Sequence, residues 1–169
     1  MSLLSLTVAG LLAMGALSLR GYAAFTHEEL AAEITIDPID ATRFYAKFKY
    51  PDGREGTYLL SGNELYVDAH ILKWQPIGNL IGLTTSFQLH RVAGRYTTIE
   101  DEQSKPRTIY ALSEKNNWDL FNLRKQFPKL GFLVDTEYGS ATFIPAGQEA
   151  EKFALLVSTT GLLIRKLPN

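Results

Sequence analysis

Cysteine is absent from this chain of 169 residues. Its absence excludes disulfide bonds, thiolate catalysis and zinc sites built on cysteine, although it fits an oxidising and a reducing compartment equally well. An excess of charge of one sign is also missing, because 17 basic and 18 acidic residues give a formal net charge of -1. A nucleic-acid surface needs a concentrated positive field, so we expect no nucleic acid among the partners.

Recognisable catalytic motifs are missing as well. No G-x-S-x-G occurs, and the glycines beside Ser61 and Ser140 indicate turns instead. No G-K-[ST] sequence occurs, which excludes a phosphate-binding loop of that type. The sequence therefore predicts a protein that is not an enzyme and that carries no cofactor.

The three histidines, His27, His70 and His90, have no compact metal-binding spacing such as H-E-x-x-H. Alternation along one predicted strand puts Asp68 and His70 on the same face, while His90 belongs to a later strand. The side chains of Asp68, His70 and His90 would approach one another only if those strands were neighbours in the right register. We therefore expect half-exposed strand positions and no metal site.

The longest uncharged stretch covers residues 3–19 and reads LLSLTVAGLLAMGALSL. A bilayer core about 30 Å thick needs roughly 20 apolar residues, so this stretch reaches the lower limit for a membrane span. No Lys or Arg precedes it, and the cleavage sites near Ala16 and Ala23 are poor, which argues against a removed signal peptide. We expect residues 1–25 to form a retained transmembrane anchor, with a cleaved signal and a soluble core helix as open alternatives.

Small residues recur along this predicted helix at spacings of four, four and three, which puts them on one helical face. They are Ser5, Ala9, Ala13 and Ala16. Small residues let two membrane helices approach closely, so this face is expected to seat a helix of a membrane protein partner. The alternative is that small residues are common in such anchors. Tyr22 and Phe25 follow at the place where an interfacial aromatic belt would lie.

The remainder, residues 26–169, is dominated by a period of two. TRFYAKFKY puts Phe44, Ala46 and Phe48 on one face, and ELYVDAHILKW does the same for its own apolar set, Leu65, Val67, Ala69 and Ile71. Strands with turn signals at short spacing predict a mainly β fold. We expect an antiparallel sandwich or barrel of about eight or nine strands, with one inserted helix.

Several local features complete the prediction. Thr26 and Glu29 resemble a helix cap and predict a short helix over 27–33, while NNWDLFNLRKQF predicts the inserted helix. QPIGNLIGL is expected to be an apolar loop that folds over the core or touches membrane, and DEQSKPR a charged loop. A bend or bulge is expected near Gly94.

The most specific polar group combines basic and aromatic side chains. Its members are Trp74, Arg91, Arg95, Tyr96, Tyr138 and Arg165. Arginine stacks on aromatic rings and pairs with carboxylates, for which Asp68 and Asp135 are candidates. We interpret the group as a network that fixes strand register; the alternative is a pocket for an anionic headgroup or a small acid.

The order of five blocks resembles a known family. The blocks are GNELYVDAHILKW, LIGLTTSFQLHRVAGRY, RTIYALS, DTEYGSATFIP and STTGLLIRK. Together they resemble an uncharacterised family of bacterial membrane-anchored proteins that is commonly labelled "cation/multidrug efflux pump" or "multidrug transporter". The chain departs from the family's usual first block at Asn63, Leu65 and His70, where Asp, Trp and Arg are usual, so no role is carried over onto these positions.

The resemblance implies a place in the bacterial inner membrane with a single pass and, because longer relatives add an N-terminal span with a basic linker, a periplasmic domain. Transport needs several helices or a closed barrel around a path, which one span cannot supply. The expected function is therefore that of a non-enzymatic, membrane-anchored accessory subunit whose β-domain docks on a membrane protein complex or on the membrane surface. The alternative is a β module that binds a small ligand or a lipid headgroup.

Overall fold

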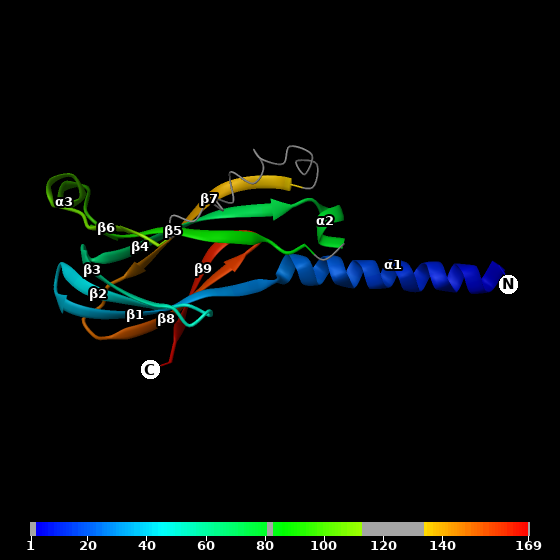
Figure 1. Ribbon diagram of the computed structural model, residues 1–169, viewed down its shortest axis with the longest axis horizontal. Coiled ribbons are helices and arrows are strands. Elements are labelled where there is room, and N and C mark those ends of the chain that lie inside the picture. Colours follow the sequence, from blue (N-terminus) through cyan, green and yellow to red (C-terminus); the bar gives the residue numbers. More distant parts are fainter. Residues whose placement is uncertain (1–2, 81–82, 113–133, 169) are drawn as a thin grey trace.

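The computed structural model describes residues 3–80, 83–112 and 134–168. Within these ranges the chain is mainly β, with nine strands in two antiparallel sheets and three helices. Helix α1 (Leu3–Thr26) projects from one end of the two sheets, so the molecule is elongated (Figure 1).

The first sheet has five strands, and the second has four. The five-stranded sheet has the order β3 (Glu55–Ser61), β2 (Arg43–Lys49), β1 (Glu28–Asp40), β8 (Glu151–Ser158) and β9 (Gly161–Leu167). The four-stranded sheet has the order β6 (Ile109–Ala111), β5 (Ser86–Arg95), β4 (Glu64–Trp74) and β7 (Val134–Pro145). Over the described ranges neither sheet closes on itself, so the sandwich is the arrangement found.

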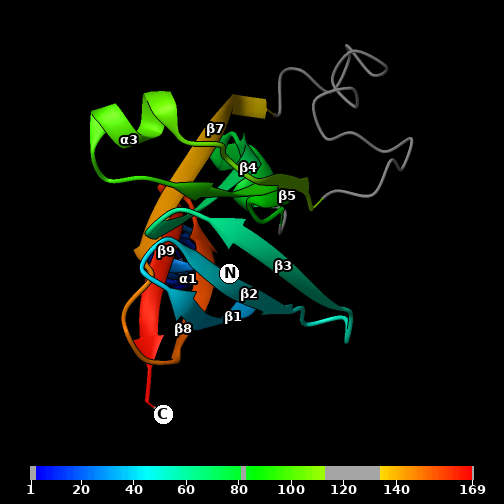
Figure 2. The same ribbon diagram turned by 90° about the vertical axis from the view of Figure 1, so that its left-hand side faces the viewer.

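The hydrophobic core lies between the two sheets, which form separate layers when viewed along the long axis (Figure 2). The predicted inner faces are confirmed: the apolar sets of 44–48 and 65–71 are all buried. Burying a side chain of the size of Phe44 or Ile71 stabilises the fold by about 1.5–3 kcal/mol. The period of two along each strand is therefore what forms the core.

The helix predicted over 27–33 is wrong. Helix α1 runs on to Thr26, and β1 starts at Glu28 after one intervening residue, His27. Ala32, Ile34 and Ile36, every second residue of β1, are buried, and the strand pairs with β2 on one side and β8 on the other. This pairing and burial outweigh the local capping signal around Thr26.

Two segments expected to be loops contain short helices. Helix α2 (Pro76–Leu80) follows β4, and α3 (Ile99–Ser104) follows β5. The Oγ1 of Thr98 caps α3 by accepting a hydrogen bond from the Asp101 backbone N–H at 3.4 Å. The predicted inserted helix at 116–127 lies outside the described residues.

The predicted bulge is present, but at another residue. The register between β4 and β5 shifts at His90, because Asp68 pairs with Arg91 while Ala69 pairs with Leu89. Gly94 has a different role, since a Cβ built there would lie 2.0 Å from the Ser61 carbonyl oxygen. A glycine at this position lets β5 approach the end of β3 closely.

Candidate functional site

The polar side chains of β4 line the outer face of the four-stranded sheet. Because side chains alternate along a strand, Tyr66, Asp68 and His70 face away from the core that Val67 and Ala69 enter. We call the outer row the following residues of β4, β5 and β7: Glu64, Tyr66, Asp68, His70, His90, Arg91, Arg95 and Phe143.

Asp68 is the centre of the outer row. Its Oδ2 accepts hydrogen bonds from the Tyr66 hydroxyl at 2.9 Å and from Arg91 Nε at 2.6 Å, and its Oδ1 accepts one from the Arg91 backbone N–H at 3.1 Å. Only 9% of Asp68 is exposed, so these charge-assisted bonds lie in a poorly solvated place. Burial, and then the hydrogen bond to Asp68, raise the pKa of the Tyr66 phenol. The hydrogen bond to Asp68 also raises the pKa of Arg91.

The bulge of β5 brings His90 to the same carboxylate. His90 Nδ1 lies 3.4 Å from Asp68 Oδ1, and the His90 ring stacks on the His70 ring with a centroid distance of 4.6 Å and an interplanar angle of 19°. The strands of Asp68, His70 and His90 are thus neighbours in the register that lets the three side chains approach one another. Among the described residues, however, no group of three or more potential ligands is arranged to hold a metal ion.

Arg95 extends the outer row toward the end of the sandwich that lies opposite α1. Its Nη1 is 3.2 Å from Glu64 Oε2, and its guanidinium lies over the Phe143 ring at 4.4 Å. The Phe143 ring is in turn 5.4 Å from the Tyr66 ring. Ion pairs, cation–π contacts and ring contacts thus connect β4, β5 and β7 across the sheet. Of the six residues predicted to form a register-fixing network, Arg91 and Arg95 belong to it.

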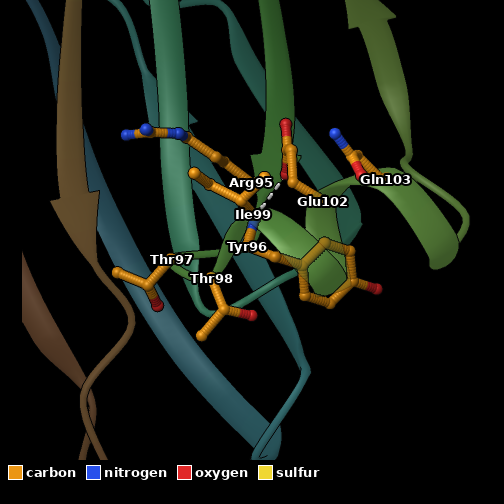
Figure 3. A pocket seen from close by; sticks show the side chains of 7 residues that line it. All are labelled: Arg95, Tyr96, Thr97, Thr98, Ile99, Glu102 and Gln103. Atoms are coloured by element: carbon orange, nitrogen blue, oxygen red, sulfur yellow. Dashed lines mark hydrogen bonds between the residues drawn. The ribbon is translucent and has the colours of Figure 1, made fainter.

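A surface pocket of about 200 Å³ lies beyond Arg95 at the same end (Figure 3). Its lining comes from the end of β5 and from α3, with Arg95, Tyr96, Thr97, Thr98, Ile99, Glu102 and Gln103. Glu102 Oε2 accepts the Tyr96 backbone N–H at 2.8 Å, and Glu102 Oε1 lies 3.0 Å from Arg107. The Glu102 carboxylate of this wall is therefore already paired through both oxygens.

The predicted ligand or partner residues do not form one site. Arg91 and Arg95 belong to the outer row, whereas Tyr96 is buried beneath the pocket with its hydroxyl 3.3 Å from the Pro106 carbonyl oxygen. Arg165 lies on β9 in the other sheet, where its Nη2 is 2.8 Å from Glu28.

Trp74 and Tyr138 belong to the part of the four-stranded sheet nearest to α1. Trp74 ends β4 and is half-buried, and Tyr138 pairs with Ile71 through the backbone of β7. Asp135, a candidate partner of the arginines, lies on β7 opposite the same part of β4, and its side chain is outside the description.

The sequence reasoning missed Glu64 and Phe143 as members of the network. The alternation of residues 64–74 placed Glu64 on the polar face, but the register that brings Arg95 opposite it depends on the bulge at His90. Phe143 is an aromatic residue on an outward face, and only the pairing of Tyr66 with it across β4 and β7 reveals its role.

The small residues predicted to lie on one face of an N-terminal helix belong to α1. Ser5, Ala9, Ala13 and Ala16 are all exposed. Over the residues that the structure describes, no helix combines the length and the apolar character that a membrane crossing requires.

Comparison of the chain with known protein families, curated proteins and solved structures gives no match in any of the three. Nothing in these comparisons links the chain to a multidrug efflux family, so that resemblance stays a prediction. The geometry alone defines a two-sheet β-sandwich with a projecting helix and a network of paired charges on one outer face.

Proposed function

We propose that this protein is a non-enzymatic, membrane-anchored interaction subunit. In this proposal α1 lies in a lipid bilayer as the transmembrane anchor, and the β-sandwich docks on a membrane protein complex or on the membrane surface. The single observation that carries the proposal is α1 itself, a helix of 24 residues that projects beyond the sandwich (Figure 1) and whose described large apolar residues are exposed.

The apolar side chains of α1 need an apolar environment. About two thirds or more of each of the following side chains is exposed: Leu4, Leu6, Leu11, Leu12, Met14 and Leu19. Apolar surface in water costs about 25 cal/mol per Å², and lipid removes that cost. The uncharged part of α1, residues 3–19, measures about 26 Å at 1.5 Å per residue, against a bilayer core of about 30 Å, so it reaches the lower limit for a span. Its backbone groups are paired within the helix, as a membrane segment requires.

The outer row supports a structural role and not a catalytic one. The Asp68 carboxylate already accepts three hydrogen bonds, and Arg91 and Arg95 each pair with a carboxylate on β4. A general base or nucleophile needs a free lone pair aimed at a substrate. These pairings instead make the sheet a firm platform for docking.

The location proposed with this function is the bacterial inner membrane, crossed once, with the sandwich on the periplasmic side. The resemblance described above supports this side of the membrane. The small residues along α1 support a helix of a membrane protein as the partner within the bilayer.

Flotation with liposomes tests the anchor. The full chain, reconstituted from detergent into phosphatidylcholine vesicles, is expected to float with them and to resist alkaline extraction. Replacing both Leu11 and Leu12 by Asp is expected to move the protein into the soluble fraction, because an acidic side chain at the middle of a bilayer costs about 2.5–3.5 kcal/mol on insertion scales.

The matched control introduces the same charges on the sandwich. Ile99 and Ile109 are 71% and 55% exposed, comparable to 66% and 70% for Leu11 and Leu12. Replacing Ile99 and Ile109 by Asp is expected to leave flotation unchanged. A native chain that stays in the buffer would refute the proposal.

A second candidate function is that of a small β module that binds a ligand or a lipid headgroup. The pocket beside Arg95 favours it, since Arg95 and two threonines are among the residues that line its volume of about 200 Å³. Saturable binding of a phosphorylated headgroup that Arg95→Gln abolishes would favour this function over docking.

A further inference from the structure

Helix α2 lies outside the sandwich and beside α1. It follows β4 directly, and Figure 1 shows it next to the C-terminal turns of α1, which it contacts. Its backbone turn is closed by hydrogen bonds from Asn79 N–H to the Gln75 carbonyl and from Leu83 N–H to the Gly78 carbonyl. Ile77, in the middle of α2, is 58% exposed although it is apolar.

With α1 embedded in a bilayer, the charge pattern of α1 defines how deep α2 lies in the membrane. Residues 3–19 are uncharged, and Arg20 is the first charged residue. A bilayer core of about 30 Å accommodates roughly 20 residues of helix, so the turns after Arg20 belong to the headgroup region. Because α2 lies beside those turns, it also lies in the headgroup region.

Two aromatic residues lie at this end of the molecule, one at the end of β4 and one in the C-terminal part of α1. Trp74 ends β4 two residues before α2, and Tyr22 is exposed on α1. Tryptophan and tyrosine are enriched at the interface between membrane and water, where an apolar ring and a polar tip are both satisfied. An exposed isoleucine gains the same kind of cover from the acyl chains just below the headgroups.

We propose that α2 and the end of β4 form a second, shallow membrane contact, with Ile77 entering the bilayer interface and Trp74 lying at headgroup level. The partner at this surface is the lipid bilayer. The inference rests on the proposed function, since it takes α1 to be embedded in lipid. Together, α1 and α2 then hold the same end of the sandwich against the membrane.

The absence of cysteine allows a direct test with single labelled positions. Three full-length variants, Leu12→Cys, Ile77→Cys and Ile99→Cys, each carry one environment-sensitive fluorophore in phosphatidylcholine vesicles. A small fraction of the lipid bears a nitroxide quencher, either at the headgroup or deep in the acyl chain. We expect the headgroup nitroxide to quench the label at Ile77→Cys and to shift its emission to the blue.

The other two positions make the outcome decisive. The label at Leu12→Cys is expected to respond to the deep nitroxide, and the label at Ile99→Cys, at the far end of the sandwich, to neither. If the Leu12→Cys label is not quenched, the membrane anchor is refuted. If that label is quenched but the Ile77→Cys label behaves as the Ile99→Cys label does, the second contact alone is refuted.

A second measurement covers the case in which the Ile77→Cys label disturbs α2. The chain has two tryptophans, Trp74 and Trp118, so Trp118→Phe leaves Trp74 as the sole indole. Its emission is expected to lose intensity with the headgroup nitroxide and to lose less with the deep one. Equal emission with and without quencher, in a protein that floats with the vesicles, would overturn the second contact.

Discussion

Asp68 illustrates how one carboxylate organises a sheet face. It lies on β4, and it holds the side chain of Arg91 on β5 and of Tyr66 on its own strand. The Arg91 guanidinium also lies 5.9 Å from the centre of the Tyr66 ring. Since the bulge at His90 changes the register just before Arg91, the Asp68–Arg91 pair stabilises the bulged register over the regular one.

Asp68→Asn is expected to destabilise the protein by about 1–3 kcal/mol, because an amide has one acceptor oxygen and turns donors toward Arg91 or Tyr66. Urea unfolding of the full chain in detergent measures the difference. Asp52→Asn is the matched control, since Asp52 also binds an arginine, Arg54, through Nε at 2.7 Å but lies on an exposed turn. A loss at Asp68 no larger than the loss at Asp52 would contradict the central place of Asp68.

At the scale of single residues the sequence predicts much of the site and not its connections. Alternation assigns Asp68 to the polar face, and the positive charge of Arg91 makes it a candidate partner for the Asp68 carboxylate. The separation of Arg165 from the others depends on which sheet β9 joins, and strand order across two sheets is a property of tertiary packing. The pairing of Arg95 with Glu64 likewise depends on a one-residue bulge that no local pattern encodes.

Strands were predicted more reliably than helices. The bounds of β4 follow from the alternating run ELYVDAHILKW, and those of β9 from the run GLLIRKL after a turn. The hairpin of β2 and β3 follows from PDGREG between two predicted strands. The helix at 27–33 was wrong because a capping pattern of three residues is a weak signal beside the pairing of a central strand. Helix α3 was missed because its six residues are too few to show a period.

Gly94→Ala is expected to destabilise the sandwich by about 1–3 kcal/mol, because the new methyl group would meet the Ser61 carbonyl oxygen, a backbone atom that moves only with β3. Thermal unfolding followed by circular dichroism measures the loss.

Gly139→Ala on β7 is the matched control for Gly94→Ala. No atom lies within 4 Å of a Cβ built at Gly139. Since glycine within a strand costs about 0.5–1 kcal/mol relative to alanine, this variant is expected to be neutral or slightly more stable. Equal losses at the two glycines would show that the close approach of β3 and β5 is not what requires Gly94.

At the scale of the whole molecule, two tyrosines make stability depend on alkaline pH. Burial, and then the neighbouring Tyr58, raise the pKa of Tyr50, whose ring stacks on Phe48 at 6.1 Å. The pKa of Tyr66 is raised as well. A folded-state pKa above the unfolded value of about 10 means that the unfolded chain releases its proton first. The contribution to stability is therefore complete below about pH 10 and declines as the pH rises further.

The expected result is a free energy of unfolding that falls between about pH 10 and pH 11, and that falls less steeply in Tyr50→Phe. Urea titrations of both proteins at each pH provide the comparison. Parallel curves for the native chain and Tyr50→Phe would exclude Tyr50 as a source of the decline.

The direct passage from α1 into β1 has a mechanical consequence. Only His27 separates the helix from the strand, and β1 is the middle strand of its sheet. The joint is one residue long, and the backbone after it pairs with β8 from Glu28 onward and with β2 from Glu33 onward, so the helix has little freedom to swivel against the sheet. A rotation or tilt imposed on the helix by its surroundings is therefore transmitted to the sheet. The end of the sandwich around α3, which lies opposite α1, then moves through the largest arc.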